Sequence, residues 1–401
     1  LAETLRHHPI LFDAVLTADF FAELPAAPAL AVEMAESLGE ARDFQDVLDV
    51  LRRRTSDRVF QAGVHILRHH VSPEEAGRAL SDIAETALGA LFPAVEAELA
   101  GHHGDVPGGA MAVVALGKLG GRELTIGSDL DLLFVYVNPN GAAASSGPRP
   151  LPAIQYFTRL GQRFLAAVTA PTAEGKLYEV DMRLRPSGEA GPIATSLEAF
   201  ARYQRESAWT WEHMALTRAR VIYGPDFIAA PLGDAIGDIL TAPRDADALL
   251  GDVGDMRMRM ERELGSGDIW NIKQLRGGLV DIEFIAQYLQ LRHGHEAPHV
   301  LAPNTTDALA RLRDAGLLDR ATADELIAAM GLWRNLQGII RLGFGEGFTE
   351  DDAREDSRDL VARACGALGF DALRGEITET AGRVHAIFET LIPAPAGAGA
   401  D

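Results

Sequence analysis

The chain has 401 residues, 47% of them hydrophobic, and its 58 acidic and 37 basic residues give a formal net charge of −21. This apolar content excludes an intrinsically disordered chain, and the length predicts two or three packed domains. Nucleic-acid backbones are bound through basic surfaces, so the acidic balance argues against DNA or RNA as the main substrate. The densest basic cluster, Arg52-Arg53-Arg54, is expected to lie on a solvated helix face.

Membrane contact and disulfide bonds are not expected either. Uninterrupted apolar runs are much shorter than the roughly 20 residues that a membrane-spanning helix needs. Cys365 is the only cysteine, which excludes an internal disulfide and fits a reducing cytoplasm. The chain starts at Leu1 without a basic and apolar leader, so we expect a piece of a longer, cytoplasmic protein.

Three regions and a tail follow one another along the chain. Residues 1–100 form a predicted N-terminal helical region, because apolar residues recur there at helical spacing. Residues 101–225 contain short, apolar, β-branched runs that predict strands. Helical spacing returns over residues 226–392, and residues 393–401 are expected to be a flexible tail. The predicted strands are Met111–Leu116, Leu130–Val137 and Leu177–Arg185, and the predicted helices include Ala29–Leu38, Ile83–Leu99, Ile154–Val168, Ala246–Leu264, Leu279–Leu291, Thr322–Leu342 and Ile377–Leu391.

Two aspartates stand two residues apart at the start of an apolar strand. Asp129 and Asp131 alternate with Leu130 and Leu132. Side chains alternate between the two faces of a strand, so both carboxylates are expected on one face. Neighbouring carboxylates repel each other unless a cation lies between them. Mg²⁺ takes a couple of carboxylates together with substrate phosphates, so the pair predicts a magnesium site.

A later strand carries further charged side chains. Alternation along this strand places Glu179, Asp181, Arg183 and Arg185 on one face. A carboxylate beside two arginines suits a metal next to a polyphosphate, because arginine binds phosphate through two parallel hydrogen bonds. The alternative is an exposed strand with alternating surface charge. The aspartate pair that precedes this strand favours the first interpretation, a site for a metal and a polyphosphate.

Gly120-Gly121 lies shortly before the aspartate pair. Such a pair predicts a turn whose backbone N–H groups can approach phosphate oxygens. The segment is not a P-loop, because Leu119 follows Lys118 where Ser or Thr is required, and it lacks the dinucleotide-binding fingerprint. Lys118 either neutralises a phosphate or is solvated; the sequence leaves both open.

Another glycine pair, Gly277-Gly278, precedes a predicted helix that contains Asp281 and Glu283. A helix N-terminus can bind an anion, but acidic residues in a first turn are also ordinary partners of the helix dipole. We favour the structural role for this element.

These segments resemble a known family. The Gly-Gly pair, seven further residues and Asp-Leu-Asp, with a later strand aspartate, resemble the polymerase-β-like nucleotidyltransferase superfamily. The segments GKLGGRELTIGSDLDLLFVY, YEVDMRLRPSGEAG, ESAWTWEHMALTRARVIYG and GGLVDIEF are similar to bacterial glutamine synthetase adenylyltransferase, an enzyme with two related halves. The match covers about residues 111–294. The RLRPSG form (183–188) and the WTWEH segment (209–213) look more like the C-terminal, adenylylating half.

The resemblance implies an α+β fold: a polymerase-β-like palm with a small mixed sheet, flanked by helical domains and largely helical overall. It implies that Asp129, Asp131 and Asp181 bind two Mg²⁺ ions. AMP would pass from ATP to a tyrosine hydroxyl of glutamine synthetase, with release of pyrophosphate. The residues expected beside the nucleotide phosphates are Lys118, Gly120, Gly121, Ser128, Arg183 and Arg185.

The PII signal protein is the expected regulator, and three other functions stay open. The first is the half that removes AMP from the same tyrosine by phosphorolysis. The second is a regulatory module that only senses nucleotide or PII, although an inactive copy has no need of three aspartates. The third is uridylylation of PII, which would be expected to need further sensory domains.

Overall fold

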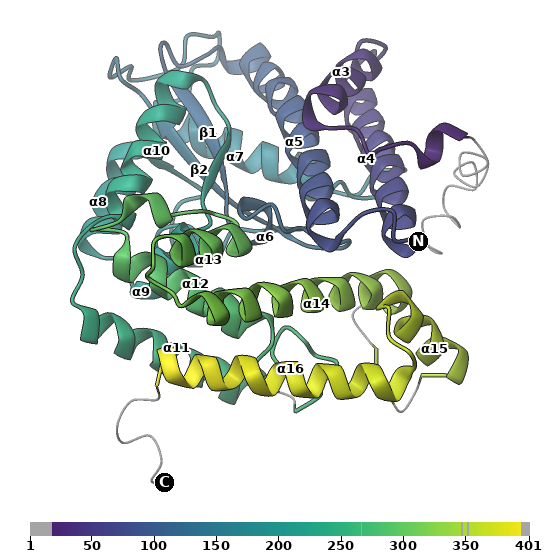
Figure 1. Ribbon diagram of the computed structural model, residues 1–401. Helices are drawn as coiled ribbons and strands as arrows, with labels where there is room; N and C mark the ends of the chain where they lie inside the picture. The colour runs from purple at the N-terminus through teal and green to yellow at the C-terminus, as the bar shows by residue number, and fades with distance from the viewer. Residues whose placement is uncertain (1–17, 266, 346–347, 351–352, 394–401) are drawn as a thin grey trace.

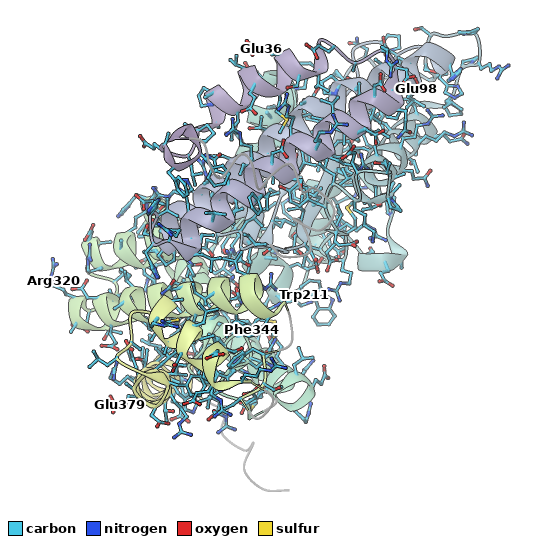
Figure 2. The ribbon with its side chains drawn as sticks, turned by 90° about the vertical axis from the view of Figure 1, so that its right-hand side faces the viewer. Glu36, Glu98, Trp211, Arg320, Phe344 and Glu379 are labelled. Carbon is cyan, nitrogen blue, oxygen red and sulfur yellow. The ribbon has the colours of Figure 1, made fainter. Side chains whose placement is uncertain are left out.

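A computed structural model describes residues 18–265, 267–345, 348–350 and 353–393 (Figure 1). A small mixed sheet lies between an N-terminal group of helices and a larger C-terminal group. Figure 2 shows Glu36 and Glu379, from these two groups, at opposite ends of the molecule. The protein is therefore mixed α/β and largely helical, as the sequence predicts.

Among the described residues, three α-helices make up the N-terminal group. α3 (Ala27–Leu38) and α4 (Phe44–Leu67) pack against each other and against α5 (Pro73–His103). A capping box begins α5: the Glu75 N–H donates to Ser72 Oγ, and the Ser72 N–H donates to the Glu75 carboxylate. The predicted helices in this region are confirmed, and α5 is longer than the apolar pattern indicated.

The sheet has five strands in the order β3-β2-β1-β5, with β4 also paired to β2. β1 is antiparallel to β2 and β5, whereas β2 is parallel to β3 and β4. The first two strands are those predicted, with β1 shifted by one residue. The strand bounds are Ala110–Ala115 (β1), Leu130–Val137 (β2), Val180–Asp181 (β3), Ala194–Ser196 (β4) and Arg220–Tyr223 (β5).

Both faces of the sheet are covered by helices. Val113 of β1 belongs to a hydrophobic core with α5 and α7 (Ala153–Thr169), whereas Val114 belongs to a second core with the C-terminal helices. The two leucines that flank Asp131 in β2 belong to the first core. By strand alternation, Asp131 therefore faces the C-terminal helices.

The C-terminal group begins after β4 and is interrupted only by β5. Figure 1 shows α14 and α16 running side by side along one edge of this group. Among the described residues, no helix is long and apolar enough to cross a membrane. The helix bounds are Leu197–Glu206 (α8), Thr210–Leu216 (α9), Asp226–Leu240 (α10), Ala246–Leu264 (α11), Leu279–His293 (α12), Thr305–Asp314 (α13), Arg320–Phe344 (α14), Glu355–Ala364 (α15) and Phe370–Leu391 (α16), with short 3₁₀ helices at Ala18–Phe21 (η1), Gly188–Ala190 (η2) and Pro298–Val300 (η3).

The third predicted strand, Leu177–Arg185, is much shorter than expected. Only Val180–Asp181 forms β3, because the Asp181 carboxylate accepts a hydrogen bond from the Arg183 N–H (2.8 Å) and the chain turns there. Strand alternation therefore does not extend to Arg183 and Arg185, and that part of the prediction is wrong.

Other features also differ from the prediction. β4 and β5 were not predicted, and Gly117–Gly120 forms α6, a single helical turn. Arg52 is buried, so the basic cluster is not wholly a solvated face. The expected tail lies outside the described residues apart from Pro393. The boundaries proposed for the three regions stay predictions.

Candidate active site

Three aspartates line one cleft between the sheet and the C-terminal helices. Asp129 stands directly before β2, Asp131 is the second residue of β2, and Asp181 is the last residue of β3. Asp131 and Asp181 are register partners on neighbouring parallel strands, so their side chains emerge next to each other on one face. The structure thus brings together the three carboxylates that the sequence singles out.

Gly117 leaves the space that Asp131 occupies. Its φ is +52°, and a Cβ atom built there would lie 2.0 Å from Asp131 Oδ2. Any other residue would collide with the carboxylate and would also be strained at this backbone angle. The first glycine of the α6 turn is therefore required by the position of the neighbouring carboxylate.

The three carboxylates differ in their electrostatic surroundings. Burial raises the pKa of Asp131 to about 6, with Asp181 and Asp129 adding repulsion that Arg218 and Lys273 partly offset. Hydrogen bonds from the Arg183 side chain, of which the Nε contact is 2.8 Å, lower the pKa of Asp181. Asp131 is therefore the carboxylate most in need of a further cation.

The carboxylates form a donor set that suits Mg²⁺, since it prefers oxygen ligands and would relieve the repulsion at Asp131. In the described part of the chain, however, no group of three or more His, Cys, Asp or Glu side chains is spaced to hold a metal ion. The Asp181 carboxylate forms an ion pair with Arg183.

Basic side chains line the same cleft, namely Lys118, Arg183, Arg218, Lys273 and Arg341. Lys118 Nζ donates to Gln337 Oε1 of α14 and lies 3.5 Å from Thr125 Oγ1. Burial lowers the pKa of Lys118 to about 7, and the nearby charges of Arg341 and Lys273 add to this effect. Lys118 is thus a cleft residue rather than a freely solvated lysine.

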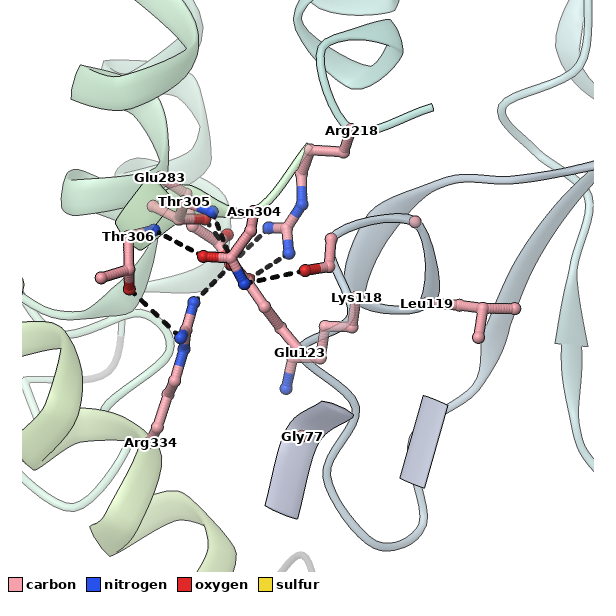
Figure 3. Close-up of polar contacts among 12 residues, drawn as sticks. Gly77, Lys118, Leu119, Glu123, Arg218, Glu283, Asn304, Thr305, Thr306 and Arg334 are labelled. Atoms are coloured by element: carbon pink, nitrogen blue, oxygen red, sulfur yellow. Dashed lines mark hydrogen bonds and ion pairs between the residues drawn. The ribbon is translucent and has the colours of Figure 1, made fainter. Parts of the chain in front are cut away.

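A buried ionic network holds Arg218 in place (Figure 3). Glu123 forms ion pairs with Arg218 and Arg334 and accepts a hydrogen bond from the Thr305 N–H (2.6 Å). Arg218 also pairs with Glu283, at 2.9 Å. Burial alone would raise the pKa of Glu123, but Arg218 and Arg334 outweigh it and hold the pKa below its usual value. The network joins the segment after α6 to α13 and α14.

Gly120 and Gly121 do not have the geometry expected for phosphate binding. Their N–H groups donate to the carbonyls of Leu116 and Gly117 within the α6 turn. A Cβ atom on Gly120 would lie 1.9 Å from the Arg218 carbonyl oxygen. The glycines therefore allow close packing against Arg218, and their contact with phosphate stays a prediction that these internal hydrogen bonds do not support.

The remaining predicted phosphate residues divide into two groups. Ser128 and Arg183 line the cleft with Lys118. Arg185 is not among the lining residues: its guanidinium donates to the carbonyls of Met182 (2.8 Å) and Glu189 (3.0 Å). These hydrogen bonds stabilise the loop after β3, and contact of Arg185 with a phosphate stays a prediction.

Four charged residues of the cleft were not predicted as site residues: Arg218, Lys273, Glu283 and Arg341. They come from segments far apart in the chain, so no local spacing indicates that they meet. Asp281, by contrast, has the structural role that we favoured. Its buried carboxylate pairs with Arg257 and accepts the Gly277 N–H.

The sequence was compared with known protein families. The family model of glutamate-ammonia ligase adenylyltransferase matches residues 1–231. The chain belongs to this family. A model of GlnD PII-uridylyltransferase matches residues 256–392, which cover most of the C-terminal helices. The resemblance drawn from the sequence motifs is thereby confirmed at the level of the family.

Curated relatives of this adenylyltransferase family are much longer than the chain. The bifunctional glutamine synthetase adenylyltransferase/adenylyl-removing enzyme of Rhodopseudomonas palustris strain TIE-1 is 42% identical over 98% of this chain and 40% of the relative. The enzyme of the same name from Brucella suis biovar 1 is 42% identical over 100% of this chain and 40% of the relative. The chain therefore spans about two fifths of the length of these relatives.

Proposed function

We propose that this chain transfers AMP from ATP to a tyrosine hydroxyl of glutamine synthetase and so regulates nitrogen assimilation. The observation that carries the proposal is the single cleft in which Asp129, Asp131 and Asp181 meet Lys118 and other basic side chains. Carboxylates and cations in one cleft suit phosphoryl chemistry, which depends on positioning and on stabilising charge. Membership of an adenylyltransferase family supports the same chemistry.

The reaction forms one bond and breaks another. The phenolic oxygen of the acceptor bonds to the α-phosphorus, the bond to the oxygen that bridges the α- and β-phosphates breaks, and pyrophosphate leaves. A phenol has a pKa of about 10, so its proton has to be withdrawn during the attack. The cleft carboxylates are proposed to orient the acceptor hydroxyl and to accept that proton.

Asp129, Asp131 and Asp181 would hold Mg²⁺, which supplies positive charge to the attacking and leaving oxygens when it is bound. Arg183 controls the access of Asp181 to this role, because its guanidinium and its N–H are both bonded to that carboxylate. Ser128 and Lys118 are proposed to contact the nucleotide phosphates from the cleft wall.

The adenylyl-removing activity is the second candidate, because the relatives' printed name includes it. Similarity of residues 183–188 and 209–213 to the adenylylating half favours AMP addition. The match of residues 256–392 to a PII-uridylyltransferase model supports PII as the proposed regulator.

Two parallel reactions test the direction. One contains the chain, Mg²⁺, ATP and unmodified glutamine synthetase, and mass spectrometry follows the gain of one AMP on a tyrosine. The other contains adenylylated glutamine synthetase and phosphate, and ADP is followed. We expect the first product and little of the second. ADP release without AMP transfer from ATP would show that the chain is the adenylyl-removing half.

A further inference from the structure

Three basic side chains of the cleft form no ion pair among the described residues. Arg218 is already paired with Glu123 and Glu283, and Arg183 is paired with Asp181. Among the described residues, the remaining cleft cations, Lys118, Lys273 and Arg341, form no ion pair.

Their contacts are with neutral groups. Lys118 donates to the Gln337 amide oxygen, and Arg341 Nη1 lies 3.1 Å from Thr125 Oγ1 and 3.2 Å from Ser128 Oγ. Neutral acceptors satisfy the hydrogen-bond donors but leave the positive charges in place. These contacts also fix Arg341 directly beside the segment that leads into Asp129.

Lys118 lies close enough to Arg341 and Lys273 to be repelled by both, whereas Glu283 acts on it in the opposite sense. Arg341 and Lys273 both oppose protonation of Lys118, which burial already disfavours. Like charges gathered in a partly buried cleft cost free energy unless an anion joins them. The anion has to reach Lys118 of α6, Arg341 of α14 and Lys273, which precedes α12, at the same time. A polyphosphate is long enough and carries several charges.

We propose that Lys118, Lys273 and Arg341 bind the β- and γ-phosphates of ATP, the part that departs as pyrophosphate. This inference rests on the proposed function and extends it. Two of the three cations, Lys273 and Arg341, then come from the C-terminal region. The three cations would hold the leaving group, and the cleft carboxylates would hold Mg²⁺ beside the reacting α-phosphate. Charged donors aimed at a departing polyphosphate stabilise the charge that develops there.

The test uses Lys273→Gln and Arg341→Gln, with Arg320→Gln as the matched control. Lys273 is exposed, so its replacement leaves the fold intact. Arg320 is an exposed arginine of the same helix as Arg341, at the opposite end from Phe344 (Figure 2). Isothermal calorimetry with Mg²⁺ present measures the Kd of ATP, of inorganic pyrophosphate and of AMP for the complete chain.

We expect each cleft variant to weaken ATP and pyrophosphate by about tenfold or more, as for one lost charge-assisted contact, and AMP by less than about twofold. Arg341→Lys, which keeps the charge, should retain most of the affinity. Unchanged ATP and pyrophosphate affinities in Lys273→Gln and Arg341→Gln would overturn the inference. A raised KM for glutamine synthetase with ATP binding intact would do so too, because the cations would then contact the acceptor protein.

Binding is measured without turnover, so this inference and the proposed function can fail separately. Pyrophosphate binding that depends on Lys273 and Arg341 supports the inference even if no AMP reaches glutamine synthetase. AMP transfer at the wild-type KM for ATP in both variants would contradict the inference and leave the proposed function standing.

Discussion

Replacing Asp131 with asparagine should stabilise the metal-free protein while abolishing AMP transfer. Burial, together with two neighbouring carboxylates, raises the pKa of Asp131 from 3.8 to about 6 in the folded protein. Each pKa unit corresponds to about 1.4 kcal/mol, so the ionised carboxylate costs at most about 3 kcal/mol of folding free energy. Allowing for its partial contact with solvent, we expect a gain of about 1–3 kcal/mol at neutral pH.

The difference should disappear in acid. An acid with a folded pKa above its unfolded value binds its proton more tightly in the folded state, so folding becomes less favourable as pH rises through that range. For Asp131 the destabilisation is complete above about pH 6 and absent below about pH 4. Wild type and Asp131→Asn should therefore differ in unfolding free energy at neutral pH and converge across this window.

Urea unfolding followed by circular dichroism, with and without Mg²⁺, measures the effect. Mg²⁺ should stabilise the wild type and leave Asp131→Asn nearly unchanged, because the variant lacks a proposed ligand. Asp129→Asn is the matched control, since its carboxylate is exposed and its removal should change metal-free stability little. An Asp131→Asn protein that is less stable than wild type at neutral pH, or that responds equally to Mg²⁺, would refute the reasoning.

Three further predictions concern residues around the carboxylates. Gly117→Ala should lower AMP transfer by about 100-fold or more, because the added Cβ would collide with Asp131. Its control is Gly127→Ala, which has φ +71° and open space around it and should only lose about 1–2 kcal/mol of stability in thermal unfolding through backbone strain. Equal activity losses in the two variants would argue against steric exclusion. Arg185→Gln should reduce the unfolding free energy by about 1–3 kcal/mol, because the loop carbonyls lose their hydrogen-bond donor. Its ATP affinity in calorimetry should stay near that of wild type. A selective loss of ATP binding would instead indicate that Arg185 contacts a phosphate. Because the pKa of Lys118 is about 7, pyrophosphate binding should take up a proton near neutral pH and should weaken as the pH rises to about 8. Calorimetry in two buffers measures this proton uptake. The same uptake in Lys118→Met would contradict the prediction.

Local periodicity predicted the parts of the site that depend on one strand. Leu130–Val137 alternates between two environments, so the apolar neighbours of Asp131 already determine which way its carboxylate faces. The same reasoning failed beyond Asp181, because its carboxylate binds the Arg183 N–H and ends the strand. A side-chain bond to the backbone competes with strand pairing and leaves no trace in the polar and apolar pattern.

Tertiary packing determines the positions of several side chains that the local sequence pattern could not predict. Arg341 and Lys273 come to the cleft only because α14 and the segment before α12 fold over the sheet. Arg52 is buried because carbonyls of Ala167 and Ala170 need donors, at 2.7 and 2.8 Å, although its neighbours in the sequence are basic. The Ala167 and Ala170 carbonyls are far from Arg52 in the sequence, so the local pattern did not indicate that Arg52 is buried.

In the proposed reaction, Asp129, Asp131 and Asp181 act with Mg²⁺ in the transfer of AMP from ATP to glutamine synthetase. The most direct measurement follows label from α-³²P-ATP onto glutamine synthetase while Mg²⁺ is titrated, for wild type, Asp129→Asn, Asp131→Asn and Asp181→Asn. We expect Mg²⁺-dependent labelling by wild type, a loss of about 100-fold or more in each variant, and no label from γ-³²P-ATP. Labelling that persists without divalent cations, or full activity in any of the three variants, would contradict it.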